Sequence, residues 1–441
     1  MLGFEHNFLF IKKTRKHPIL LYLNCRETRQ KKWSYVYMNI TMNIPGLKDV
    51  VITKVEQYED IVRLYVEMER KNHRCPACNN WTRRVHDYRI QKIHHLKWFE
   101  RKTQIFYKRR RYSCECGKRF SEKNPIVERY QRTSIEWNQA VSIRAIKGKT
   151  FKETGDHYGT SSTTIVRRFD CLANSEIKEV EQLPKVIAID EYKGDTREGK
   201  YQLIIADGIT KKPLDILPNR YKKTIKRYLQ KHGNDVQVVV MDMSQSFKAA
   251  VQQALGRPVI VADRFHFYRY IFWALDGVRR RAQQEFHEYD RKKCKRMKYV
   301  FHKAQSELTD EEQWHLDRYL EMSKDLKVAY ELKEAFRSWF YRAKEIGQEQ
   351  ITQVKQELKD FYQLVEASEI PEMKKAIQTI QNWQTEILNS FAYNFSNGFL
   401  EGINNSTKVL KRNAFGFRSF KRFRAKILLS HQYKGIGVHI G

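Results

Sequence analysis

The chain has 441 residues, and its 83 Lys and Arg against 51 Asp and Glu give a formal net charge of +32. This length allows two to four domains with sizeable cores. The charge favours a polyanionic partner, nucleic acid before a membrane surface, because each neutralised phosphate releases counterions. No apolar run reaches the roughly 20 residues of a membrane span, and the start lacks the pattern of a signal peptide. We therefore expect a cytoplasmic protein without a membrane partner.

Residues 1–41 form a basic N-terminal extension without clear periodicity. Two explanations remain open. In the first, the natural start is Met38 or Met42, just ahead of the first well-patterned segment, and the earlier residues come from an over-long reading frame. In the second, the extension is a basic arm that contacts phosphates.

Residues 44–130 alternate apolar and polar residues, which is typical of a small β-rich domain. Two close cysteine pairs in this segment can supply four thiolates to one tetrahedral Zn²⁺, leaving no open position, so we expect a structural zinc. The second pair has a tight one-residue spacer, so His73 or His86 could replace one member. A basic strand edge between the pairs is a candidate for phosphate contacts. The predicted zinc ligands are Cys75, Cys78, Cys114 and Cys116, and the predicted DNA contacts are Arg109, Arg110 and Arg111.

Residues 131–172 are predicted to be helical in three pieces, the last two with helix-turn-helix spacing. Gly155 would allow close crossing of the helices, and Ser162 would cap the second one. Ile165 and Val166 would anchor it. A helical hairpin without DNA contact is the alternative, but the basic context favours a DNA-binding domain. The side chains that could face a major groove are Ser162, Thr163, Arg167 and Arg168.

A charged linker at 173–184 leads into a mixed α/β core, whose first part covers residues 185–275. We expect strands at 186–190, 201–207, 213–217, 236–242 and 258–263, and helices at 224–232 and 246–255. An antiparallel hairpin followed by helix, strand, helix and strand is the order of an RNase H-like core.

Residues 276–390 are charge-rich and poor in Gly and Pro, which indicates an all-helical insertion. The last part of the core would follow at 391–432, and residues 433–441 would form a C-terminal tail. The predicted fold class is therefore α/β plus α: an RNase H-like core interrupted by helices, preceded by the zinc-binding and helix-turn-helix domains.

Three carboxylates are candidates for a two-metal site. Asp190 ends the apolar run 186–189, Asp242 ends 238–241, and Glu401 lies on the polar face of a probable helix. Carboxylates can hold a pair of Mg²⁺ ions about 3.5–4 Å apart, which suits the cutting and joining of nucleic acid. Asp263 also ends an apolar strand and competes with Asp242. We favour Asp242 as the ligand and expect Asp263 beside it, with His266 either orienting a phosphate or carboxylate or serving the structure alone.

The helix of Glu401 shows a predicted buried stripe of Leu400, Ile403, Thr407 and Leu410. Its other face would carry Glu401, Asn404, Asn405, Lys408 and Arg412. A basic stretch follows directly. Candidates for phosphate contacts near the carboxylates are Lys408, Lys411, Arg412, Arg418, Lys421 and Arg422.

Four sequence blocks together resemble the signature of the ISL3 family of bacterial insertion-sequence transposases, and the likeness covers about residues 44–432. The blocks are Ala-Ile-Asp-Glu at 188–191, Val-Ala-Asp-Arg-Phe-His at 261–266, Ser-Asn-Gly at 396–398 with Glu-Gly-Ile-Asn-Asn at 401–405, and Ala-Phe-Gly-Phe-Arg at 414–418.

The resemblance implies that Asp190, Asp242 and Glu401 form a DDE triad and that Asp263 and His266 are an accessory element. It also implies two Mg²⁺ ions, with Mn²⁺ able to substitute, and a nucleoid-associated protein that acts on double-stranded transposon ends and target DNA. Pairing two DNA ends implies at least a homodimer. Two alternatives stay open: an inactive DNA-binding regulator derived from a transposase, and an RNase H-fold nuclease that acts on branched DNA.

Overall fold

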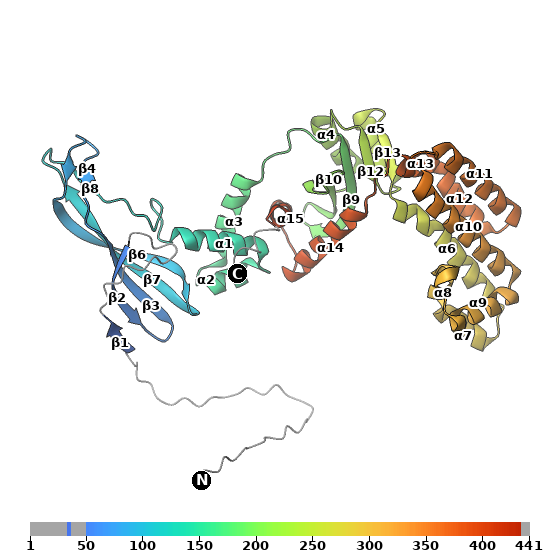
Figure 1. Cartoon of the computed structure of the whole chain (residues 1–441), viewed down its shortest axis with the longest axis horizontal. Helices are drawn as coiled ribbons and strands as arrows, with labels where there is room; N and C mark the ends of the chain where they lie inside the picture. Colours follow the sequence, from blue (N-terminus) through green and yellow to red (C-terminus); the bar gives the residue numbers. More distant parts are fainter. Residues whose placement is uncertain (1–32, 37–49, 434–441) are drawn as a thin grey trace, which may run out of the picture. The chain divides into compact units, whose positions relative to one another are not determined.

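The computed structural model describes residues 33–36, of which only the backbone is considered, and residues 50–433. They belong to two compact units, Met1–Trp137 and Asn138–Gly441, which are described separately (Figure 1). The two predictions about residues 1–41 lie outside the described residues, except for the short strand β1 (Trp33–Val36). The predicted tail lies outside them too, beyond Tyr433.

The first unit is a β-sheet with strand order β1-β2-β3-β7-β6, and β8 pairs with β7. The long strands β6 and β7 form a hairpin that turns at Phe99 and Glu100, where φ is 46° and 61°. Leu64, Ile93 and Ile105 are fully buried in its core. The predicted β-rich character of this segment is confirmed. The strands are β2 (Val50–Gln57), β3 (Ile61–Met68), β4 (His73–Arg74), β5 (Trp81–Thr82), β6 (Val85–Trp98), β7 (Arg101–Ser113) and β8 (Arg119–Ser121).

Three helices follow, as predicted: α1 (Ile135–Lys147), α2 (Phe151–Tyr158) and α3 (Ser162–Glu176). Gly159 ends α2 in a left-handed conformation, with φ 65°. The cap of α3 is Ser161, whose side chain accepts from the Thr164 amide, so the predicted cap at Ser162 was wrong by one residue. The prediction for Gly155 is confirmed, because a Cβ there would lie 2.7 Å from the Thr160 carbonyl oxygen.

A five-stranded mixed sheet forms the centre of the second unit, in the order β11-β10-β9-β12-β13. β9 runs antiparallel to β10 and parallel to β12, which in turn is parallel to β13. The elements are β9 (Val186–Thr196), β10 (Gly199–Asp207), β11 (Pro213–Leu217), α4 (Lys222–His232), β12 (Val238–Met241), α5 (Gln245–Leu255) and β13 (Val259–Ala262).

Both faces of this sheet are buried, because successive side chains on a strand point to opposite sides. Ile187 and Ile189 pack on one side with α4, α5 and the following helices. Val186 and Ala188 pack on the other side with α14 (Gly398–Asn413) and α15 (Phe420–Gln432). A helix from the far end of the sequence therefore covers the strand that carries Asp190.

Residues between β13 and α14 are almost entirely helical, as expected for 276–390, although the first helix already begins at Arg264. These helices share one apolar core with the face of the sheet that carries Ile187 and Ile189. No helix in the described residues is both long and apolar enough to cross a membrane. The helices are α6 (Arg264–Ala282), α7 (Glu288–Arg296), α8 (Lys298–His302), the 3₁₀ turn η1 (Gln305–Glu307), α9 (Asp310–Met322), α10 (Lys324–Ile346), α11 (Ile351–Ser368), α12 (Pro371–Asn382) and α13 (Gln384–Ala392).

Substitution of two helical glycines tests this packing. Gly155→Ala forces the Thr160 carbonyl to shift and should lower the free energy of unfolding by about 1–3 kcal/mol. Gly402→Ala places a Cβ with nothing within 4 Å of it. This variant should raise the free energy of unfolding by about 0.5–1 kcal/mol, because alanine has the higher helix propensity. Urea denaturation of the full chain, followed by circular dichroism, measures both. A Gly155→Ala variant as stable as the unmodified chain would contradict the packing.

Candidate functional site

Three aspartates follow one row of the mixed sheet. Ile189 of β9 lies opposite Met241 of β12, and Met241 lies opposite Ala262 of β13. Asp190, Asp242 and Asp263 are the next residues on these three strands. The parallel register therefore brings them to the same edge, at the carboxyl ends of β12 and β13, where open α/β sheets bind their ligands.

Asp242 and Asp263 share a histidine from the first turn of α6. The Nε2 atom of His266 lies 3.0 Å from Asp242 Oδ2, and its Nδ1 atom lies 2.9 Å from Asp263 Oδ2. Burial disfavours a charge on this ring, but the hydrogen bonds to Asp242 and Asp263 outweigh it and raise the pKa of His266 to about 9. At neutral pH the imidazolium therefore offsets part of the negative charge at this edge.

Asp190 is only partly exposed, whereas Asp263 beside it is buried. The Oδ2 atom of Asp190 accepts a hydrogen bond of 2.6 Å from the Asn404 side chain, and its Oδ1 atom accepts one of 2.7 Å from the Glu191 amide. Burial and, after it, the negative charge of Asp242 raise the pKa of Asp190 to about 7. The ionised carboxylate of Asp190 is therefore destabilised where it lies, and a bound cation would stabilise it.

Helix α14 presents one face to this edge. Asn397, Glu401 and Asn404 follow the i, i+4, i+7 spacing of a single helical face. Asn397 donates to the Ile189 carbonyl at 3.3 Å, and Asn404 donates to Asp190. Glu401 stands between these two anchored residues, and its side chain is exposed. Helix α14 thus carries Glu401 to the strand that holds Asp190, across a sequence separation of about 200 residues.

The donor set fits a divalent cation such as Mg²⁺. Carboxylate oxygens are its preferred protein ligands. Asp242 Oδ1 is buried and has no hydrogen-bond partner in the described part of the chain. A buried acceptor without a partner is costly, and a bound cation would remove that cost. Asp242, Asp263 and His266 also have ligand atoms within 4.8 Å of one another, but both ring nitrogens of His266 bind the two carboxylates, so the carboxylate oxygens are the available ligands.

Two expectations about these residues need correction. Asp190 does not end its strand, because residues beyond it pair with β10 and extend β9 to Thr196. The strand that ends beside Asp190 is its parallel neighbour β12. Asn404 is not on a polar, exposed face but buried against Asp190. Sequence reasoning missed this contact, although the spacing of Asn397, Glu401 and Asn404 could have indicated it.

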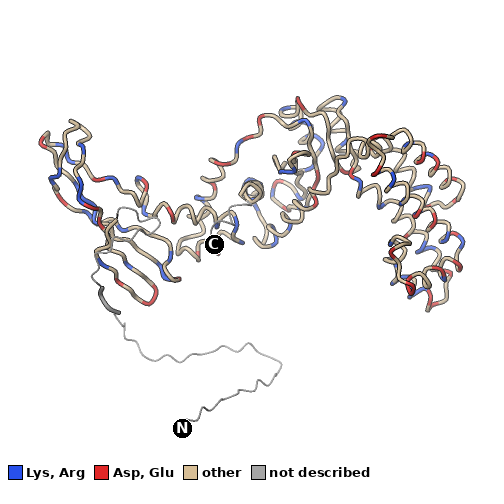
Figure 2. The backbone as a smooth tube through the Cα atoms, viewed as in Figure 1, with Lys and Arg blue, Asp and Glu red and all other residues tan. Residues whose placement is uncertain are grey.

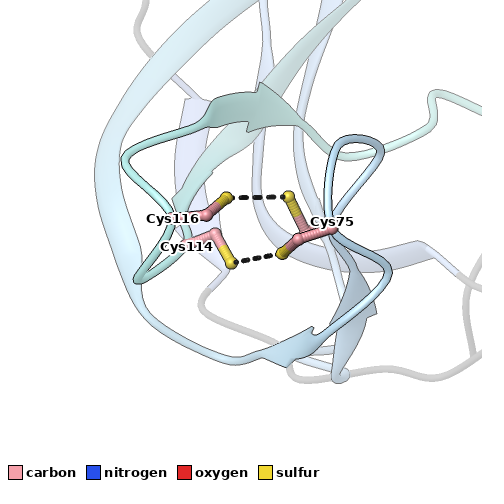
Figure 3. A group of neighbouring side chains, drawn as sticks. Cys75, Cys114 and Cys116 are labelled. Carbon is pink, nitrogen blue, oxygen red and sulfur yellow. Dashed lines mark hydrogen bonds between the residues drawn. The ribbon is translucent and has the colours of Figure 1, made fainter.

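The four predicted cysteines meet in one cluster in the first unit (Figure 3). Sulfur–sulfur distances are 3.6 Å for Cys75 and Cys116 and 3.5 Å for Cys78 and Cys114. Tetrahedral coordination with Zn–S bonds of about 2.3 Å requires sulfurs about 3.8 Å apart, so the cluster fits Zn²⁺. His73 packs its ring against Tyr112 instead, and the cluster contains no histidine of the described residues. The one-residue spacer of the second pair therefore does not prevent a Cys₄ site.

The predicted DNA contacts of the first unit have partners within their own sheet. Arg110 is only 6% exposed and pairs with Glu67 and Glu122. Arg109 donates to the Glu122 carbonyl, and Arg111 pairs with Asp87 at 3.0 Å. Arg110 thus stabilises the sheet, and we leave it out of the proposed DNA-contacting residues.

Basic residues are spread along both units (Figure 2), but those predicted to bind DNA differ in availability. Ser162, Thr163 and Arg167 of α3 are exposed, and Arg168 is half-buried and already has a partner. Lys411 pairs with Asp195 at 2.6 Å, and Arg422 pairs with Asp170 at 2.8 Å. The exposed members of the C-terminal set are Lys408, Arg412, Arg418 and Lys421.

Three family models match successive parts of the chain. A zinc-finger model of transposases IS204/IS1001/IS1096/IS1165 matches residues 71–116, and a model of the helix-turn-helix domain of transposase family ISL3 matches residues 122–172. A transposase model of the same family matches residues 187–427, more than half of the 441 residues. The chain belongs to the ISL3 family of transposases. The resemblance seen in the sequence blocks is confirmed, together with the zinc-ribbon and helix-turn-helix domains.

Two curated proteins extend the comparison. The transposase for insertion sequence element IS1001 of Bordetella parapertussis is 24% identical over 401 residues, 87% of this chain and 96% of that protein. A protein of Lactococcus lactis subsp. lactis named ATP-dependent protease is 35% identical over 119 residues, 26% of this chain and 34% of that protein. The first match spans nearly all of both proteins.

Zinc content tests the cysteine cluster. We expect about one zinc per purified chain, and Cys116→Ser should lose it because three thiolates and a hydroxyl bind the ion poorly. Cys171→Ser is the matched control, since Cys171 is an exposed free cysteine outside the cluster. Elemental analysis by mass spectrometry measures both variants. A Cys116→Ser chain that keeps a full equivalent of zinc would show that another residue is the fourth ligand.

Proposed function

We propose that this ISL3 transposase binds the ends of its insertion sequence and catalyses divalent-metal-dependent DNA cleavage and strand transfer. The observation that carries the proposal is the row of aspartates at one sheet edge, faced by the helix of Glu401. In this reaction water attacks a phosphodiester and releases a 3′-hydroxyl, which then attacks a phosphodiester of the target DNA.

The catalytic core is proposed to be RNase H-like. Its support is the strand order β11-β10-β9-β12-β13, with an antiparallel hairpin on one side of β9 and two parallel strands on the other. Helices α6 to α13 would then be an insertion between the last strand and α14. The predicted domain boundaries, 44–130, 131–172, 173–184, 185–275, 276–390 and 391–432, belong to the same proposal.

Asp190, Asp242 and Glu401 would hold the two Mg²⁺ ions, for which Mn²⁺ could substitute. The ions supply an activated nucleophile and stabilise the leaving oxygen. Asn404 fixes the orientation of the Asp190 carboxylate through its hydrogen bond of 2.6 Å. His266 positions Asp242 and Asp263, and it carries positive charge beside them. Asp263 is 6% exposed, whereas Asp242 keeps one carboxylate oxygen, Oδ1, without a hydrogen-bond partner in the described residues, which favours Asp242 as the ligand.

DNA would be held by two sets of exposed groups. The recognition helix α3 offers Ser162, Thr163 and Arg167 to a major groove. Exposed basic residues of α14 and of the following segment would contact phosphates closer to the carboxylates. Arg422 and Lys426 instead bind Asp170 and the Gly148 carbonyl, which fastens α15 to the helix-turn-helix. Pairing of two ends implies at least a dimer during the reaction.

Removal of one carboxylate tests the proposal. Asp190→Asn should reduce cleavage of a labelled duplex carrying the element's end by about 10⁴-fold, the scale of losing a catalytic group. Affinity for the duplex in EDTA and the melting temperature should both be kept, because the change removes a charge that repels Asp242. Cleavage by the unmodified chain should require Mg²⁺.

Asp207→Asn is the matched control. Asp207 lies on the adjacent strand, and its Oδ1 atom caps a turn through the amides of Ile209 and Thr210, which asparagine can also do. This variant should cleave normally. An Asp190→Asn variant that cleaves at an unreduced rate would refute the proposed site. If the unmodified chain binds the ends but does not cleave them with any divalent ion, the protein would be a DNA-binding regulator instead.

A further inference from the structure

One phenylalanine of the second unit has an unusual position. Phe415 lies two residues beyond Asn413, the last residue of α14, and is 92% exposed. Its φ is 56°, in the left-handed region, and Gly416 follows with φ 93°. The Phe415 amide donates to the Arg412 carbonyl and the Gly416 amide to the Lys411 carbonyl, so the helix end is well defined.

Nothing in the fold explains a phenylalanine at this position. The left-handed backbone favours Gly or Asn over a bulky residue. An apolar ring that is 92% exposed gains almost nothing from burial within the described chain. Strained residues of this kind occur where a ligand is bound. The Phe415 ring is therefore available to a partner outside the chain.

The backbone around Phe415 is held by contacts on both sides of the turn. Phe417 turns inward and stacks on Phe423 with 4.7 Å between ring centroids. The Arg197 amide donates to the Arg418 carbonyl at 3.2 Å, and Lys411 pairs with Asp195. These contacts anchor both sides of the turn to the β9–β10 hairpin and to α15. Phe415 is exposed to solvent, as is Gly416 beside it.

An exposed polar strip leads from the carboxylates to this ring. Glu401, Asn405, Lys408 and Arg412 recur at helical spacing on one face of α14, and all four are exposed. In the described part of the chain, no acidic partner contacts Lys408 or Arg412. From Glu401 to Phe415 the helix rises by about 21 Å, or roughly six base steps of B-DNA.

We propose that Phe415 inserts between two base pairs of the DNA end, at a step about six base pairs from the bond that is cut. The inference rests on the proposed function, because it needs DNA lying along α14 with a phosphate at the carboxylates. An apolar wedge of this kind unstacks and kinks a duplex. Lys408 and Arg412 would hold the intervening phosphates and fix the register of the ring.

The experiment uses the full chain in EDTA and duplexes with the terminal sequence of the encoding element. 2-Aminopurine replaces one base at a time at positions 3 to 10 from the cleavage site, and its fluorescence rises when it is unstacked. We expect a rise of at least about threefold at one or two adjacent positions near the sixth. Phe415→Tyr should keep the rise, and Phe415→Asn should abolish it while affinity changes less than tenfold.

Phe99→Asn is the matched control, since Phe99 is also 92% exposed with a left-handed backbone, φ 46°, but lies in the first unit. The Phe99→Asn variant should keep the rise in 2-aminopurine fluorescence. Asparagine suits this backbone, so Phe415→Asn should remain folded, which its melting temperature verifies. An unchanged rise in Phe415→Asn, or no rise anywhere on a bound duplex, would overturn the inference. If the chain binds and cleaves the duplex but no 2-aminopurine fluorescence rises, only the insertion of Phe415 is overturned. If the chain binds and the fluorescence rises but no cleavage occurs with divalent ions, only the proposed function is overturned.

Discussion

The parallel pairing of β9, β12 and β13 is the constraint on which the second unit depends. It sets Ile189, Met241 and Ala262 in one row, so the aspartates that follow them must meet at one edge. Three carboxylates so close repel one another, and burial adds to the cost of charging Asp190. The fold tolerates this because both faces of the sheet are packed with apolar side chains. A stable scaffold thus holds an unstable charge arrangement, as expected where a cation is bound.

Helix α14 connects the packing of this scaffold with its chemistry. Leu400, Ile403 and Thr407 are buried towards the sheet, while Asn397 and Asn404 bind Ile189 and Asp190 of β9. The remaining exposed face carries Glu401 at one end and leads to Phe415 at the other. One helix therefore secures the sheet, orients Asp190 and offers a surface on which DNA would lie. The fastening of α15 to the helix-turn-helix by Arg422 and Lys426 joins that surface to the recognition helix.

Much of this arrangement could be predicted because local patterns dictate it. Apolar runs such as 238–241 gave the strands, and the cysteine pairs gave the zinc cluster. What the sequence could not give depends on pairing between distant segments. The polar residues after Asp190 carry no apolar signal, yet they pair with β10 and prolong the strand. Asn404 is polar and was placed on an exposed face, whereas its partner, Asp190, is 214 residues away. Arg110 was part of a basic run, and only the folded sheet supplies Glu67 and Glu122 as its partners.

We propose that Asp190, Asp242 and Glu401 bind divalent ions together. The most direct test is a crystal structure of the full chain with Mn²⁺ and an end duplex whose scissile phosphate is replaced by a non-hydrolysable analogue. The anomalous scattering of Mn²⁺ distinguishes the bound ions from water molecules. We expect two peaks, with Asp190 as a ligand of both ions, Asp242 of one ion and Glu401 of the other. A single peak held by Asp242, Asp263 and His266, with Glu401 and Asp190 uninvolved, would contradict it.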